Sequence, residues 1–281
     1  MKRNVPLLKH PIQSADAFGA LIQSCSTAMA ATTGGAEYRF FAGPHSATNL
    51  GFLWGQGSEG IKRTLDLEIN LMNDHEKAFR ARGHEAYSCD IQEPSGGHPE
   101  WHILGDALLP LRGGQIETMD DKGHYIDAWD LLIAHPPCTY LSNAGARHLW
   151  KGHQLQANRV MLGIQGRDLF MRFWWADVPR ICVENPVPSK VFCLPPYTQA
   201  VQPYEYGHPY SKKTCLWLKA LPPLFPTDIV EPVATWCPSG SYAHKHDERN
   251  KGMFTTDRAK NRAKTFPGIA KAMSEQWGDL L

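Results

Sequence analysis

Three short apolar runs along the chain predict the strands of a sheet. They cover residues 130–134, 180–184 and 214–218, and proline follows each run within four residues. Continuous apolar runs of this length are typical of strands that are buried on both faces. Proline ends such strands because it cannot donate a hydrogen bond to a neighbouring strand. We therefore expect all three runs to lie inside a sheet.

A helical pattern separates the first two of these strands. Residues 154–176 predict a helix, with Met161, Ile164, Phe170 and Phe173 near one face. From about residue 61 onward, strand and helix signals alternate in this way. Such alternation favours a parallel sheet with helices on both of its faces.

A second helix and strand are predicted upstream. Residues 78–82 are typical of a helix end, and Gly83 follows them, as glycine commonly follows the last residue of a helix. Residues 87–89 then predict a strand that leads into Asp90. This order places a carboxylate at the end of a strand.

The N-terminal part of the chain has a different character. We expect residues 1–60 to form a partly helical, loop-rich extension, with a helix at about 14–30, and residues 61–281 to form the catalytic domain. Between 65 and 71, apolar and polar residues alternate, as in a half-exposed strand. The same residues could equally belong to a long helix over 61–82.

Composition narrows the class of protein. A chain of 281 residues is long enough for one large α/β domain with a small appendage. Its seven cysteines form no CxxC pair, which favours reduced thiols in the cytoplasm and no metal site. No apolar run approaches the ~18 residues of a membrane helix, so we expect no membrane partner. A net charge of +1 excludes a uniformly basic surface but not a local basic face.

Two residues whose side chains can take part in catalysis are found at the ends of two predicted strands. Cys138 comes after the first strand and Pro136-Pro137, and Glu184 ends the second strand, just before Asn185. Because ligands of open α/β sheets bind at the carboxyl ends of the strands, both side chains are expected at one ligand-binding edge. A thiol and a carboxylate in this setting can act as a nucleophile and its acid or base partner.

Around these residues, the sequence resembles the phage-type DNA cytosine-5 methyltransferases. Pro136-Pro137-Cys138 with Ser142 is similar to the Pro-Cys motif of that family, and Glu184-Asn185-Pro186 to its Glu-Asn-Val motif. Residues 207–214, which contain Lys212 and Lys213, resemble the basic motif that follows, with lysines in place of arginines. The resemblance covers about residues 77–278 and implies a Rossmann-like class I methyltransferase fold, with a mostly parallel sheet and helices on both faces.

The resemblance also implies a reaction and its participants. Cys138 would add to carbon-6 of a flipped-out cytosine in DNA, and carbon-5 would take a methyl group from S-adenosylmethionine. Glu184 would hold the base, for which a raised pKa would be useful. Pro137, Ser142, Asn185, Lys212 and Lys213 would bind the substrate. We expect a monomer, encoded by a phage or acting in the cytoplasm of a bacterial host cell.

The cofactor residues are matched by their order in the chain. Asp90 and Asp106 match the two acids that bind the ribose and the adenine of S-adenosylmethionine in this family. The glycine-rich turn of the family is missing from residues 69–73, and Phe41 with Gly43 is the favoured substitute. Glycines 55, 57 and 60 form a G-x-G-x-x-G that is a second candidate.

Two alternative functions remain open. The first is an amino-methyltransferase that acts on DNA bases, because residues 135–138 also resemble the acid-Pro-Pro-aromatic motif of that class. Cys138 stands where that motif needs an aromatic residue, which argues against it. The second is a DNA-binding relative whose use of the cofactor has lapsed or changed.

Overall fold

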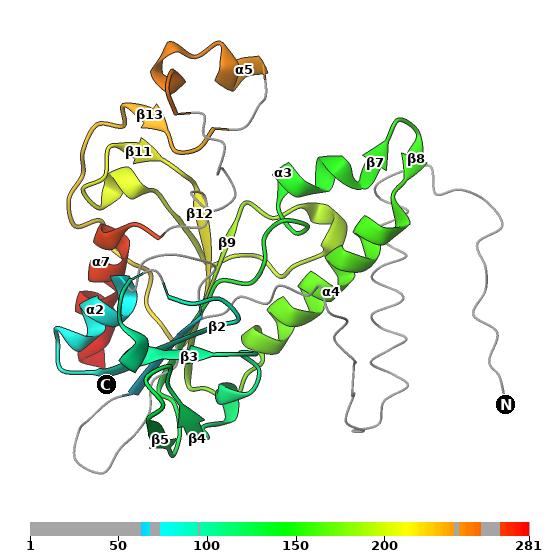
Figure 1. Ribbon diagram of the computed structural model, residues 1–281. Helices are drawn as coiled ribbons and strands as arrows, with labels where there is room; N and C mark the ends of the chain where they lie inside the picture. Colours follow the sequence, from blue (N-terminus) through cyan, green and yellow to red (C-terminus); the bar gives the residue numbers. More distant parts are fainter. Residues whose placement is uncertain (1–62, 68–73, 95, 239–241, 254–264, 281) are drawn as a thin grey trace, which may run out of the picture.

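A computed structural model describes residues 63–67, 74–94, 96–238, 242–253 and 265–280 (Figure 1). The predicted extension over 1–60 lies outside these ranges, and so do its helix at 14–30 and the proposed cofactor turn at Phe41 and Gly43. The prediction of a domain boundary at residues 60 and 61 lies outside them as well.

A seven-stranded sheet forms the centre of the described chain. Its strands follow the order β10-β12-β9-β6-β1-β2-β3. They are β1 (Arg63–Leu67), β2 (Glu85–Asp90), β3 (His102–Leu104), β6 (Leu131–Ala134), β9 (Arg180–Pro186), β10 (Gln199–Val201) and β12 (Thr214–Lys219). The successive strands β9, β6, β1, β2 and β3 are parallel to one another, whereas β12 is antiparallel to both β9 and β10.

Three two-stranded sheets and the helices complete the described elements. The small sheets are β4 (Gly114–Glu117) with β5 (Gly123–Ile126), β7 (Trp150–Lys151) with β8 (Gln154–Leu155), and β11 (Tyr210–Ser211) with β13 (Ala234–Thr235). The α-helices are α2 (Asp74–Arg80), α3 (Asn143–Ala146), α4 (Ala157–Trp174), α5 (Tyr242–Lys245) and α7 (Pro267–Trp277).

The three apolar runs are confirmed as strands β6, β9 and β12, each within two residues of its predicted ends. The described part of the alternating segment, residues 65–67, lies in strand β1 (Arg63–Leu67) and not in a long helix over 61–82. It lies between β2 and β6, near the middle of the sheet. The predicted helix end before Gly83 is α2, which stops three residues earlier, and Gly83 has the positive φ of 84° that favours glycine there.

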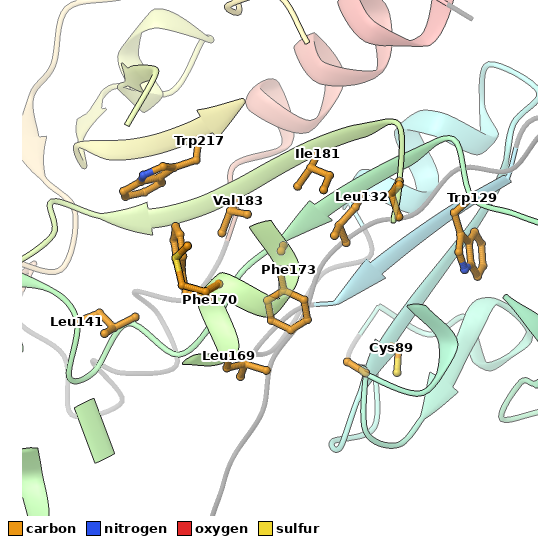
Figure 2. Packing of buried hydrophobic residues seen from close by; sticks show 14 of the residues in the cluster. Cys89, Trp129, Leu132, Leu141, Leu169, Phe170, Phe173, Ile181, Val183 and Trp217 are labelled. Atoms are coloured by element: carbon orange, nitrogen blue, oxygen red, sulfur yellow. The ribbon is translucent and has the colours of Figure 1, made fainter. Parts of the chain in front are cut away.

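The strands divide their side chains between two apolar clusters. In β9, Ile181 and Val183 belong to one cluster and Cys182 to the other, as expected where successive side chains point to opposite faces. The first cluster includes Phe170 and Phe173 of α4, which Figure 2 shows beside Val183 and Ile181. The second includes residues of α2 and α7. Only part of the predicted apolar face of α4 is buried, because Met161 is 55% exposed.

The predicted fold class is wrong. We expected a Rossmann-like class I methyltransferase fold, built on a mostly parallel sheet with helices on both faces. Instead, the strands form one mixed sheet and three small sheets, and four of the nine strand pairs are antiparallel. Within the described ranges, only α2, α4 and α7 are longer than four residues.

Proline explains much of this difference. Ten prolines occur between residues 186 and 232, where a regular α/β alternation would place further helices. Proline fixes φ and lacks a backbone N–H, so it interrupts helices and sheet interiors alike. The chain there folds into short strands and 3₁₀ turns such as Lys190–Phe192 and Pro203–Glu205. In the described part of the chain, no helix has both the length and the apolar character needed to cross a bilayer.

Candidate functional site

The parallel pairing of β6 and β9 brings the two predicted catalytic segments to one edge of the sheet. Ala134 pairs with Val183 at the ends of these strands. The next residues are therefore His135 on one strand and Glu184 on the other, and Cys138 follows three residues later. Cys138 is half-buried and not in a disulfide.

A tight turn shapes the backbone at Cys138. The carbonyl oxygen of Cys138 accepts a hydrogen bond from Ser142 N at 3.0 Å. The Ser142 hydroxyl accepts one from Gly145 N at 3.3 Å, so Ser142 is the N-cap of α3. Ser142 is only 6% exposed. Ser142 thus fixes the loop that carries Cys138, and its predicted place in the substrate pocket stays a prediction.

Hydrogen bonds tie the Cys138 loop to the segment that follows Glu184. Asn185 Nδ2 donates to the carbonyl oxygen of Pro136 at 3.5 Å. Asn143 N donates to Val187 O at 3.0 Å, and Ser189 N donates to Leu141 O at 2.8 Å. Asn185 is 1% exposed and holds this loop, and its predicted contact with substrate stays a prediction. Pro137, also predicted to bind substrate, is half-buried in this clamped loop.

Glu184 lies in a partly buried, positively charged environment. His135 Nδ1 is 3.3 Å from Glu184 Oε2, and the two side chains are 12% and 13% exposed. Burial raises the pKa of Glu184, but the positive charges of His135 and Lys212 outweigh it and lower that pKa to about 2. The expectation of a raised pKa is therefore wrong for the protein without DNA. Glu184 is a carboxylate at neutral pH.

A second histidine stands behind this pair. His75 of α2 is fully buried, and its ring stacks on that of His135 with centroids 5.5 Å apart and planes at 25°. Burial, and after it the neighbouring His135, lower the pKa of His75 to about 3 against the opposing charge of Glu184. His75 is therefore uncharged at neutral pH.

The buried histidine should make the protein sensitive to acid. Because the pKa of His75 falls from 6.5 to about 3 on folding, the unfolded chain binds a proton in this range that the native protein does not. Stability should then fall as the pH falls from 6.5, by about 1.4 kcal/mol per pH unit for one such group. His75→Gln should flatten this slope by about one proton, as measured by denaturant unfolding over a series of pH values.

His102 offers a parallel case with the same sign. Burial lowers the pKa of His102 to about 4, and its ring contacts Ser88 Oγ at 2.8 Å and Gln92 O at 3.0 Å. His102→Gln should flatten the slope of stability against pH over the range from pH 6.5 to about 4.

For the His75→Gln variant, an unchanged slope of stability against pH would contradict the assignment of an uncharged, buried imidazole at position 75.

The two predicted lysines do not act together. The Lys212 side chain lies over the ring of Phe266, with Nζ 5.6 Å from its centroid, and its charge lowers the pKa of Glu184. The exposed Lys213 side chain instead lies 5.8 Å from the centroid of Tyr197. Of the two, Lys212 is the one whose charge acts on Glu184, and the predicted substrate contacts of both lysines stay predictions.

The two predicted cofactor acids meet beside Cys89. Asp90 ends β2, is 3% exposed, and accepts a hydrogen bond from Gln92 N at 2.9 Å. Asp106 follows β3, is exposed, and accepts one from Leu108 N at 3.0 Å. Cys89 directly precedes Asp90, and its thiol donates to the carbonyl oxygen of Gly105, the neighbour of Asp106, at 3.6 Å. Burial, and after it both carboxylates, raise the pKa of Cys89 well above its usual value.

Sequence reasoning missed the two histidines of the site. His135 could have been found, because it directly follows a predicted strand and precedes Pro136, one strand away from Glu184. No comparable signal identifies His75, which lies 60 positions earlier in the chain. Among the residues that the structure describes, no cluster of three or more histidine, cysteine or acidic side chains could hold a metal ion.

No protein-family model matches this chain, and no match to it was found among the curated proteins or the solved structures.

Proposed function

We propose that this protein is a DNA cytosine-5 methyltransferase with Cys138 as its nucleophile and Glu184 as the residue that holds the target base. The observation that carries the proposal is the pairing of β6 with β9. It places Glu184 next to the end of β6, from which the loop with Cys138 continues, and the hydrogen bond from Asn185 to Pro136 O holds the two segments together. The motif resemblance around these residues supports the same reaction.

The two side chains have complementary tasks in such a reaction. The Cys138 thiolate adds to carbon-6 of cytosine, and this addition makes carbon-5 nucleophilic enough to take a methyl group. Loss of the proton from carbon-5 then breaks the bond between sulfur and carbon-6 and regenerates the thiolate. Glu184 accepts a hydrogen bond from the exocyclic amine and shares a proton with ring nitrogen 3, so that it distinguishes cytosine from thymine.

Asp90 and Asp106 fit the ribose and adenine end of S-adenosylmethionine. When it is bound, this cofactor supplies an electrophilic methyl group. Both acids lie at the carboxyl ends of neighbouring parallel strands, and each has one oxygen fixed by a backbone N–H. Carboxylate oxygens oriented in this way are suited to accept hydrogen bonds from hydroxyl and amino groups. The expected turn at Phe41 and Gly43 would hold the methionine end of the cofactor.

The DNA partner follows from the chemistry of the site. A half-buried thiol cannot reach carbon-6 of a stacked base, so the cytosine must leave the helix. Lys212 would approach the flipped base or its phosphate, and the exposed Lys213 would contact the backbone of the DNA. We propose that the protein acts as a monomer in the cytoplasm of a bacterial host cell, either as a host or as a phage-encoded enzyme.

Mass spectrometry of nucleosides tests the proposed function directly. Unmethylated DNA incubated with the protein and S-adenosylmethionine should yield 5-methylcytosine, and omission of the cofactor should abolish it. N4-methylcytosine or N6-methyladenine would instead support the amino-methyltransferase. A protein that binds DNA but yields no methylated nucleoside, even with S-adenosylmethionine near millimolar concentration, would support the DNA-binding relative with lapsed cofactor use.

A further inference from the structure

His135 and Glu184 form a close pair that the proposed reaction has not yet used. The two residues are neighbours at the ends of parallel strands, and 3.3 Å separates His135 Nδ1 from Glu184 Oε2. Both side chains are nearly nine-tenths buried. A hydrogen bond at this point fixes the rotation of the carboxyl group and leaves its second oxygen for a ligand.

The ring of His75 packs against His135 and keeps its imidazole in place. His75, fully buried in α2, stacks on the ring of His135 with centroids 5.5 Å apart. A stacked ring on one side and a carboxylate on the other restrict the rotamer of His135. Histidine is also the side chain that most readily gains or loses a proton near neutral pH. The pair therefore combines a fixed carboxylate with a neighbour that can supply a proton.

Glu184 needs such a neighbour. With its pKa lowered to about 2, Glu184 is a carboxylate at neutral pH and holds no proton of its own. Addition of the thiolate to carbon-6 pushes electron density onto ring nitrogen 3, which must then take up a proton. The nearby charge of Lys212 disfavours protonation of Glu184 from solvent. A proton held on a group next to the carboxylate could reach ring nitrogen 3 through Glu184 without first being taken up from solvent.

We propose, on the basis of the cytosine-5 methyl transfer proposed above, that His135 positions Glu184 and stores the proton which Glu184 passes to ring nitrogen 3 of the target cytosine. The proton leaves Nδ1 of the imidazolium, moves to the Glu184 carboxylate and then to nitrogen 3 as sulfur bonds to carbon-6. It returns along the same path when that bond breaks. Neither an oxidant nor any other reactant is needed.

The surroundings of the pair set how this transfer depends on pH. Glu184 faces His135 from the end of β6, His75 from α2, and Lys212 from the turn before β12. The Cys182 and Cys215 thiols are also within range of its charge, and burial raises the pKa of both, so they remain uncharged at neutral pH. Only His135 among these groups both contacts Glu184 and belongs to a residue type that exchanges protons near neutral pH.

The test is a double-substitution cycle with His135→Asn and Glu184→Gln. Asparagine can still donate a hydrogen bond to Glu184 but cannot store a proton, so His135→Asn should lower the methylation rate at neutral pH by at least tenfold. Its rate should also rise as the pH falls, whereas that of the wild type should fall at alkaline pH as the stored proton is lost. In the Glu184→Gln background, His135→Asn should cost nothing more, because His135 acts through Glu184. His148→Asn, an exposed histidine elsewhere, is the matched control.

The outcomes separate this inference from the function on which it rests. If the wild type yields no 5-methylcytosine, the proposed function fails, and the role of His135 fails with it. If the wild type is active and His135→Asn matches it at every pH, the role of His135 alone is overturned. Additive losses in the double variant would likewise overturn it, since they indicate a merely structural role. Should His135→Asn not fold, a wild-type rate that shows no alkaline decline would contradict the proposal.

Discussion

Cys138→Ala is expected to abolish methylation and covalent capture of DNA that contains 5-fluorocytosine. Fluorine at carbon-5 cannot leave as a proton does, so the bond between sulfur and carbon-6 persists once the methyl group has been transferred. Wild-type protein should therefore form a complex with such DNA that survives denaturation. The alanine variant lacks the sulfur and should form none, as judged by denaturing gel electrophoresis.

Cys193→Ala provides the control for this prediction. Cys193 is also half-buried and not in a disulfide, but it lies at the end of a 3₁₀ turn and donates to the carbonyl oxygen of Lys190. Its removal should leave both capture and turnover intact. Methylation by Cys138→Ala at a rate near that of the wild type would exclude the covalent mechanism.

The strands that carry the site could be predicted from the sequence because their apolar runs are short, continuous and ended by proline. The same reasoning placed Cys138 and Glu184 at one edge, which the pairing of Ala134 with Val183 supports. Adjacent strands in register bring the next residues of each strand together, and this rule needs no knowledge of the rest of the fold. Local sequence was sufficient for this part of the site.

The fold class could not be predicted in the same way. Alternating strand and helix signals suggested a mostly parallel sheet, but the chain after Pro186 reverses direction through short strands and 3₁₀ turns. Pairing direction depends on contacts between distant segments, such as Thr198 N with Leu216 O at 2.8 Å. A pattern of apolar residues marks where a strand lies but not which way its neighbour runs.

The charge of Glu184 was also beyond the reach of the sequence. Burial alone would raise its pKa, which is what a residue at the end of an apolar strand suggests. The opposite outcome depends on His135, Lys212 and their approach to one carboxylate, and these residues lie far apart in the chain. Similarly, nothing in the sequence showed that Ser142 would cap α3 or that Asn185 would bond to Pro136 O.

The ionised Glu184 has a consequence for stability as well as for catalysis. Its pKa is about 2 in the folded protein, below the 4.5 of an unperturbed glutamate, so the native state favours the carboxylate. The resulting stabilisation is fully present above pH 4.5 and is lost as the pH falls toward about 2. Glutamine at this position would lack that stabilisation at neutral pH, so the folding of a Gln variant must be checked by circular dichroism before its rate is interpreted.

Glu184→Gln is expected to lower the methylation rate by about two to three powers of ten while DNA affinity changes far less. Glutamine keeps the shape of the side chain and can still contact the base, but it cannot pass a proton to ring nitrogen 3. Loss of one well-placed hydrogen bond to the transition state typically costs about 2.7–4 kcal/mol, which corresponds to this fall in rate. Single-turnover methylation and DNA-binding titrations would measure the two quantities separately. Glu231→Gln, an exposed acid outside the site, should change neither. A folded Glu184→Gln protein that methylates within about threefold of the wild-type rate would remove Glu184 from the mechanism.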